Sequence, residues 1–186
     1  MQSFAQFLVE MPQHYPGKVT YQKDGKFIPI SSRNAHEFKV LGDDGDFVFT
    51  LDTSGNAGYI FLLKDFSGDA QHIVPVLRVL LRDSGIEDYK QAHSLRIRES
   101  FAKNNLTTHW YLLYIEKVGP IVSDTEHLEG GYILWKSFLK MSKSGKVKLS
   151  IYDREKKEET PVINQSEEDI WKQDSSGKNI VLIMRK

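Results

Sequence analysis

The chain has 186 residues and a formal net charge of zero, with 25 basic and 25 acidic side chains. This length fits a single globular domain over residues 1–186, and a hydrophobic content of 40% suffices for a buried core. The sequence has no cysteine, which excludes disulfides, thiolate metal sites and cysteine nucleophiles, and the balanced charge argues against a dedicated binder of duplex DNA.

The N-terminus has no basic segment followed by a long apolar one, and no apolar run approaches the roughly 20 residues of a membrane helix. The lack of cysteine is consistent with a reducing compartment. We therefore expect a cytoplasmic protein that has no membrane partner.

The first third of the chain is expected to form antiparallel hairpins after one short helix. Apolar residues at helical spacing predict that helix over Ser3–Met11. Asp24-Gly25 and Asp44-Gly45 are hairpin signals, because glycine accepts the positive φ that tight turns require. The flanking runs that favour strands are Lys18–Gln22, Phe27–Ile30, Glu37–Leu41, Phe47–Leu51 and, further on, Tyr59–Lys64.

Residues 72–82 fit either a helix or a strand. Leucines and valines occur at helical spacing, and Pro75 would fit the first turn of a helix that begins near Val74. The many β-branched residues favour a strand instead. We expect the helix and keep the strand as the alternative.

The middle of the chain is expected to form a hairpin over residues 93–117. His93–Phe101 alternates between apolar and polar residues, as a strand does. Thr108–Val118 is apolar on both faces and predicts a central, buried strand. Lys103-Asn104-Asn105 would supply the turn between them.

A helix is predicted over Ser123–Met141. Ser123 and Glu126 have the spacing of a capping box, in which serine and glutamate satisfy the first backbone N–H groups. Apolar residues then recur at helical spacing, and they define a stripe that should face the core: Leu128, Tyr132, Trp135 and Leu139.

The last part of the chain is expected to form strands again. Lys146–Tyr152 and Pro161–Ile163 would pair across a charged connection, and Asn179–Met184 would be a terminal strand. The predicted fold class is therefore α+β. Its mainly antiparallel, curved sheet would be built from hairpins, with one principal helix packed on a face.

No catalytic or cofactor motif is present. The sequence lacks a GxGxxG or Gly-Lys-Ser/Thr phosphate loop, a GxSxG elbow, an HExxH helix and any histidine pair at metal-ligand spacing. We therefore expect neither a cofactor nor a metal.

One set of residues has the chemistry of a hydrolytic site. In the predicted hairpin, Glu99 would lie opposite His109, and a carboxylate beside an imidazole tunes it for proton transfer. Arg98 would supply a cation for developing negative charge. The alternative function is therefore a small nuclease-like or other hydrolytic enzyme.

The leading hypothesis is a small binding or regulatory protein without catalysis. Lys136, Lys140 and Lys143 share one face of the predicted helix. A cationic stripe of this kind suits an acidic protein or a nucleic-acid backbone, although it is also typical of a solvated helix face. The sequence leaves the oligomeric state open.

Overall fold

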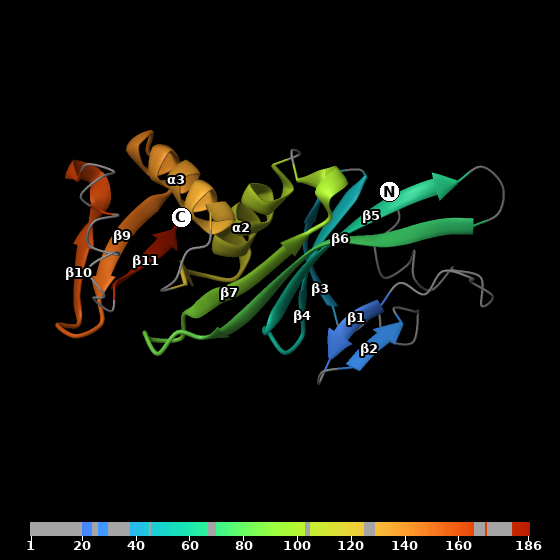
Figure 1. Ribbon diagram of the computed structural model, residues 1–186, viewed down its shortest axis with the longest axis horizontal. Helices are drawn as coiled ribbons and strands as arrows, with labels where there is room; N and C mark the ends of the chain where they lie inside the picture. The colour runs from blue at the N-terminus through green and yellow to red at the C-terminus, as the bar shows by residue number, and fades with distance from the viewer. Residues whose placement is uncertain are drawn as a thin grey trace. The chain divides into compact units, whose positions relative to one another are not determined.

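The computed structural model describes residues 20–23, 26–29, 38–44, 46–66, 70–102, 105–124, 129–165, 170 and 180–186. Its strands are β1 (Thr20–Lys23), β2 (Lys26–Pro29), β3 (Phe38–Asp43), β4 (Phe47–Asp52), β5 (Ala57–Phe66), β6 (Ala70–Asp83), β7 (Lys90–Ile97), β8 (Ile121–Val122), β9 (Lys148–Asp153), β10 (Glu158–Pro161) and β11 (Ile180–Arg185) (Figure 1). Its α-helices are α2 (Leu106–Lys117) and α3 (Glu129–Lys143), and its short 3-10 helices are η2 (Glu99–Phe101) and η3 (Val162–Asn164). The helix expected over Ser3–Met11 lies outside the described residues.

The described strands form a nine-stranded sheet in the order β10-β9-β11-β8-β7-β6-β5-β4-β3, and β1 pairs with β2 separately. β7 and β8 are parallel, whereas β3–β4, β4–β5, β5–β6, β8–β11, β9–β11 and β9–β10 are antiparallel. The predicted α+β class with a mostly antiparallel sheet is thus confirmed. The sheet is open and not strongly curled, and two α-helices accompany it rather than one.

The chain divides into two compact units, and each is described here by itself. Unit 1 comprises Met1–Leu81 and Ser94–Trp110, and unit 2 comprises Arg82–His93 and Tyr111–Lys186. The expectation of a single domain stays a prediction. No helix in the described part of the chain is long and apolar enough to span a membrane.

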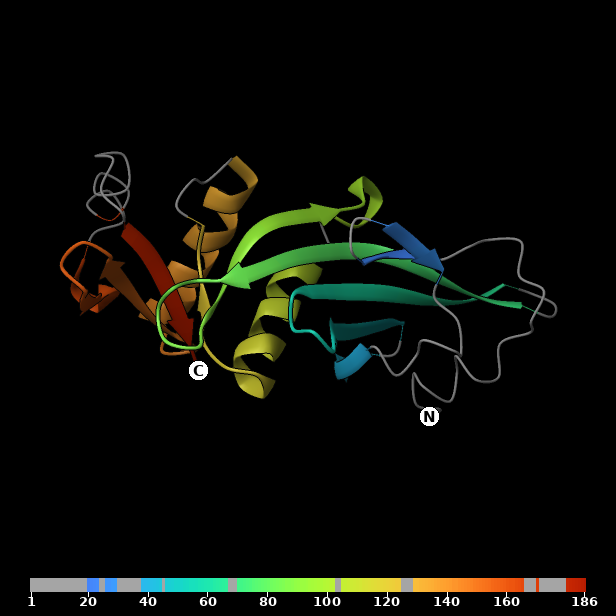
Figure 2. The ribbon, with the colours of Figure 1, turned by 90° about the horizontal axis from the view of Figure 1, so that it is seen from below.

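Unit 1 contains the hairpins that the Asp-Gly turns predict. β1 pairs with β2 on either side of the first turn, and β3 pairs with β4 on either side of the second. At the second turn, Asp44 Oδ1 accepts the backbone N–H of Phe47 at 3.2 Å. β5 continues the meander, with β4 on one side of it and β6 on the other (Figure 2).

The helix predicted over residues 72–82 is wrong, because β6 is a strand from Ala70 to Asp83. Pro75 sits at an irregularity in the register with β5: Leu77 pairs with Ile60 and Pro75 with Phe61, which leaves Val76 as an extra residue. The Val76 carbonyl accepts the backbone N–H of Arg98 at 2.9 Å. A bulge accommodates a residue that lacks an N–H, so proline does not end the strand.

The central strand predicted over Thr108–Val118 is also wrong, because this segment forms α2. An apolar run of this length suits a buried strand or a buried helix equally, since both lack a polar face. In α2 the buried side chains lie around much of the helix: Leu106, Trp110, Tyr111, Tyr114 and Ile115.

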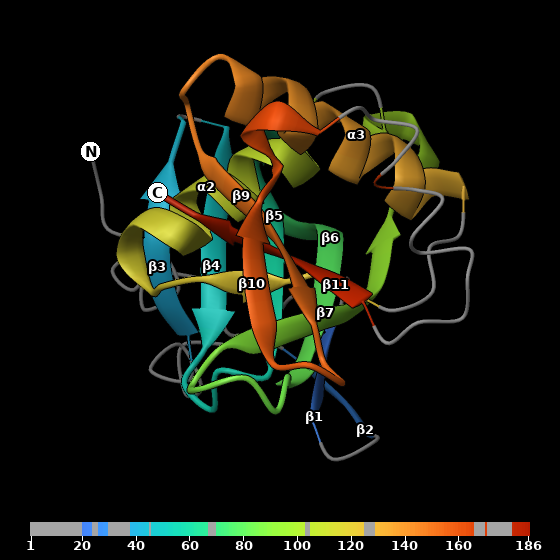
Figure 3. The same cartoon turned by 90° about the vertical axis from the view of Figure 1, so that its left-hand side faces the viewer.

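Unit 2 contains α3 and the strands β8 to β11. Figures 1 and 3 show α3 lying over one face of β9 and β11. On α3, Trp135, Phe138 and Leu139 are buried, as the predicted stripe requires, and Tyr132 is half-buried. The stripe's first member, Leu128, lies outside the described residues.

Ser123, the N-cap predicted for this helix, is hydrogen-bonded to β11, whereas Glu126, the other member of the predicted capping box, lies outside the described residues. The backbone N–H of Ser123 donates to the Leu182 carbonyl at 2.8 Å, and its hydroxyl accepts the Leu182 N–H at 2.9 Å. The described helix begins at Glu129.

The face of the unit 2 sheet opposite α3 carries a small apolar cluster. Side chains alternate between faces along a strand, so Val181, Ile183 and Arg185 of β11 share this side. Val181 and Ile183 pack with Ile86 and Val122, and Tyr89 and Tyr152 lie against them. Next to β9 lies β10, a four-residue edge strand whose residues are all exposed, and β11 is the predicted terminal strand.

Candidate functional site

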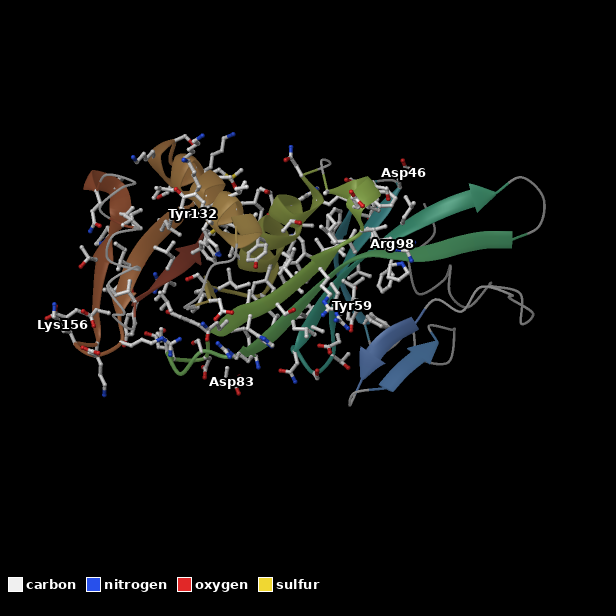
Figure 4. All side chains as sticks on the ribbon, in the orientation of Figure 1. Asp46, Tyr59, Asp83, Arg98, Tyr132 and Lys156 are labelled. Atoms are coloured by element: carbon white, nitrogen blue, oxygen red, sulfur yellow. The ribbon has the colours of Figure 1, made fainter. Side chains whose placement is uncertain are left out.

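The cross-strand pair expected between Glu99 and His109 does not exist, because the hairpin that would align them is not formed. Glu99 begins the 3-10 helix η2, whereas His109 lies on α2. Arg98 directly precedes η2 and is exposed, as is Glu99 (Figure 4). The three residues belong to unit 1, and their catalytic role stays a prediction.

The structure gives His109 a different carboxylate neighbour. Its Nδ1 atom lies 3.8 Å from Asp44 Oδ2, and its ring packs on Phe49 with a centroid separation of 4.5 Å. Both side chains of the ion pair are more than one-third exposed, so water screens their attraction. At 3.8 Å the two atoms are beyond hydrogen-bond distance, so Asp44 is a nearby carboxylate and not a hydrogen-bonded partner of the imidazole.

The lysine face of α3, which we define as Lys136, Lys140 and Lys143, is present as predicted from helical spacing. Lys140 and Lys143 are exposed and lie in the last turn of the helix, where backbone carbonyls favour cations. The Lys136 ammonium lies 5.7 Å from the centroid of the Tyr132 ring, which Figure 4 labels on α3.

An exposed isoleucine accompanies these lysines. Ile133 is 60% exposed and precedes Lys136 by three residues and Lys140 by seven, so all three share one side of α3. Within the described part of the chain, neither Lys140 nor Lys143 has an ion-pair partner. The solvent side of α3 therefore combines unneutralised positive charge with one large apolar side chain.

A second charged cluster, which no sequence pattern predicts, lies in unit 2 around Gln91. Gln91 is 3% exposed, and its amide nitrogen donates to the Ser123 carbonyl at 2.8 Å. Its amide oxygen accepts Arg82 Nε at 3.2 Å and Arg154 Nη2 at 3.4 Å. We call Arg82, Gln91 and Arg154 the arginine cluster.

Two further contacts hold the arginine cluster. Arg82 Nη2 lies 3.1 Å from Asp124 Oδ1, and Arg154 Nη1 donates to the Ser84 carbonyl at 2.8 Å. The carboxylate of Asp124 also acts on Tyr111: burial and then this negative charge raise the pKa of the Tyr111 hydroxyl. Tyr111 is therefore a neutral group at ordinary pH.

Unit 2 has a third arginine near these residues, Arg185, and its positive charge is neutralised by Glu159. Its guanidinium pairs with Glu159 at 2.5 Å and lies 5.3 Å from the centroid of the Tyr89 ring. Burial opposes ionisation of Glu159, but hydrogen bonds from Arg185 and Ser150 outweigh it and lower the pKa of the carboxyl. Arg185 and Glu159 therefore form a structural ion pair rather than a site that is open to a ligand.

The sequence does not predict the arginine cluster, because its members are far apart in the chain. Arg154 contacts Ser84 across 70 residues and Gln91 across 63. No local spacing encodes such a contact, and the strand order that creates it includes the parallel pair of β7 and β8. Among the described residues, no three histidine or acidic side chains gather as metal ligands would.

The chain matches none of the family models, curated proteins or solved structures with which it was compared.

Proposed function

We propose that this is a binding protein that recognises an acidic segment of another protein through the solvent side of α3. The observation that carries the proposal is the exposed Ile133 among the lysines of this face. Single apolar side chains are common on protein surfaces, but one that stands among exposed cations without ion-pair partners adds affinity when a partner buries it. Charge complementarity selects an acidic partner.

The isoleucine also favours a protein over a nucleic acid. Binding to a nucleic-acid backbone rests on contacts between cations and phosphates, and an aliphatic side chain adds nothing to them. An amphipathic acidic segment can meet both features, since its carboxylates face Lys140 and Lys143 while an apolar residue covers Ile133.

The proposal is tested by fluorescence anisotropy with a labelled helical peptide of glutamate and leucine. The variant Lys136→Gln/Lys140→Gln/Lys143→Gln should bind about tenfold more weakly, because each exposed ion pair is worth about 0.2–1 kcal/mol. Its affinity should also depend less on salt. Ile133→Ser should weaken binding without changing the salt dependence.

The matched control is Lys117→Gln/Lys156→Gln/Lys157→Gln, which removes equal charge from exposed positions in the same unit. It should bind the peptide as the wild type does. Equal losses in the two triple variants would show that net charge alone drives binding and would overturn the proposal. Tighter binding of a single-stranded RNA oligonucleotide than of the peptide, lost in the first variant, would replace the acidic protein with a nucleic acid.

A second candidate function, hydrolysis at His109, has one observation in its favour. Asp44 supplies a carboxylate beside the imidazole, although from a residue other than Glu99. Arg98 and Glu99 lie in the same unit as His109. The binding proposal takes precedence because the hairpin that would align Glu99 with His109 is replaced by η2 and α2.

A further inference from the structure

The arginine cluster brings two positive charges together around one neutral oxygen. Arg82 Nε and Arg154 Nη2 lie 3.2 and 3.4 Å from Gln91 Oε1, so these two nitrogens are within 6.6 Å of each other. Guanidinium groups stay protonated in proteins, so neither can relieve the repulsion by losing a proton. A negative charge nearby would stabilise these two neighbouring cations.

Among the described residues, a single carboxylate forms an ion pair with either of the two arginines of the cluster. Asp124 pairs with Arg82 through a single oxygen. Arg154 is held by the Ser84 carbonyl and the Gln91 amide, and neither of these acceptors carries a charge. In the described part of the chain, Arg82 therefore has an ion-pair partner and Arg154 has none.

The cluster also has donors to spare. Each guanidinium has five N–H donors, and the contacts above use two on Arg82 and two on Arg154. Arg154 Nε is buried and has no hydrogen-bond partner. The Arg82 side chain is 51% exposed, so the cluster opens to solvent on that side.

The support around these donors is rigid. The amide of Gln91 cannot rotate freely, because its nitrogen is bonded to the Ser123 carbonyl while its oxygen faces the arginines. The Ser84 turn is fixed by its own hydroxyl, which accepts the Ile86 N–H at 3.0 Å and donates to the Ile86 carbonyl at 3.1 Å. Donors that are already in place lose less entropy when an anion binds.

We propose that the arginine cluster binds a phosphoryl group. A phosphoryl group presents three acceptor oxygens and a charge near −2, and the planar fork of arginine suits such oxygens. Two forks can bind different oxygens of one such group. A carboxylate has only two oxygens, which a single arginine fork can satisfy, so it gives less reason for two guanidinium groups to lie together. The phosphoryl group comes either from a small phosphomonoester or from a phosphorylated side chain of a partner.

The test is calorimetric titration of the wild type with inorganic phosphate, phenyl phosphate and a phosphoserine peptide, with chloride keeping ionic strength constant. Saturable binding is expected, and it should weaken at least tenfold in Arg82→Gln and Arg154→Gln. Arg154→Lys should also weaken it, because lysine keeps the charge and loses the fork. The control Lys156→Gln removes one charge from the same turn and should leave binding unchanged.

A second measurement needs no variant and so survives poor folding of Arg154→Gln. Phenylglyoxal modifies accessible arginines, and mass spectrometry locates the product. Phosphate should protect Arg82 while leaving the exposed Arg96 and Arg98 reactive. Tighter binding of the phosphopeptide than of phenyl phosphate would assign the group to a partner protein, and the reverse order to a small molecule. Absence of saturable binding of all three probes, or equal binding by wild type and Arg82→Gln, would overturn the proposal.

Discussion

The indole of Trp110 lies directly against the backbone of Gly58. A Cβ atom at residue 58 would come within 1.9 Å of Trp110 Cζ2, a distance that no side-chain contact tolerates. The indole N–H donates to the Thr50 carbonyl at 3.0 Å, and Trp110 is fully buried. Residue 58 of β5 therefore has to be glycine, because the indole of Trp110, in the first half of α2, packs on the backbone there.

Gly58→Ala should lower the free energy of unfolding by about 3 kcal/mol, at the upper end of what overpacking costs. Chemical denaturation, read by circular dichroism, would measure the loss. The double variant Gly58→Ala/Trp110→Phe should recover part of it, because the smaller ring leaves room for the methyl group. Additive losses in the double variant would contradict the contact.

Trp135→Ala should destabilise the protein by about 3–5 kcal/mol, as the loss of a buried indole does. Trp135 is 3% exposed and packs edge-on against Tyr111 and Phe138, with centroid separations of 6.2 and 5.4 Å. The matched control on the same helix is Ile133→Ala, which should change stability by less than about 0.5 kcal/mol because Ile133 is exposed. Equal denaturation midpoints for the two variants would contradict the assigned orientation of α3.

Stability should fall above pH 10 partly through Tyr114. Burial raises the pKa of its hydroxyl from 10.0 to about 12 in the folded protein. Between these values the unfolded chain releases a proton that the folded chain retains, so the stabilisation present below pH 10 is lost as the pH rises towards 12. Unfolding midpoints between pH 9 and pH 11.5 should therefore fall less steeply in Tyr114→Phe than in the wild type. Parallel curves would rule out this contribution.

The hydrolytic alternative makes its own prediction. If His109 transfers a proton, His109→Gln should reduce cleavage of labelled single-stranded RNA or DNA at least about 100-fold, with or without magnesium. Glu99→Gln and Arg98→Gln should reduce it as well. The control His93→Gln alters an exposed histidine of unit 2 and should have no effect. An intact wild type that cleaves neither substrate would remove the support for this candidate.

The parts of the fold that the sequence predicts are those with a local chemical cause. Asp24-Gly25 and Asp44-Gly45 predict two hairpins, and the strands that flank them do pair. The stripe with Trp135 and Leu139 predicts α3, in which both side chains are buried. The lysine face of α3 follows from the same period. These features can therefore be predicted from the local sequence alone.

The parts that the sequence does not predict depend on tertiary contacts. Pro75 disfavours a regular strand, yet a one-residue irregularity opposite Ile60 and Phe61 accommodates it. Thr108–Val118 is apolar on both faces, so its state depends on what packs around it rather than on its own pattern. The pair of His109 with Asp44 joins a helix to a turn far away in the sequence, and no spacing rule anticipates it.

The short edge strand β10 affects how this protein behaves at high concentration. An exposed sheet edge invites a second chain to pair with its free backbone groups, which is the usual route to aggregation. Here the edge has only four residues, places Glu158 next to Glu159 and ends at Pro161, which has no N–H to offer. In a register that sets Glu158 opposite Glu159, a second antiparallel copy would bring carboxylate against carboxylate. The edge therefore resists sheet extension through the identity of three of its four residues, Glu158, Glu159 and Pro161.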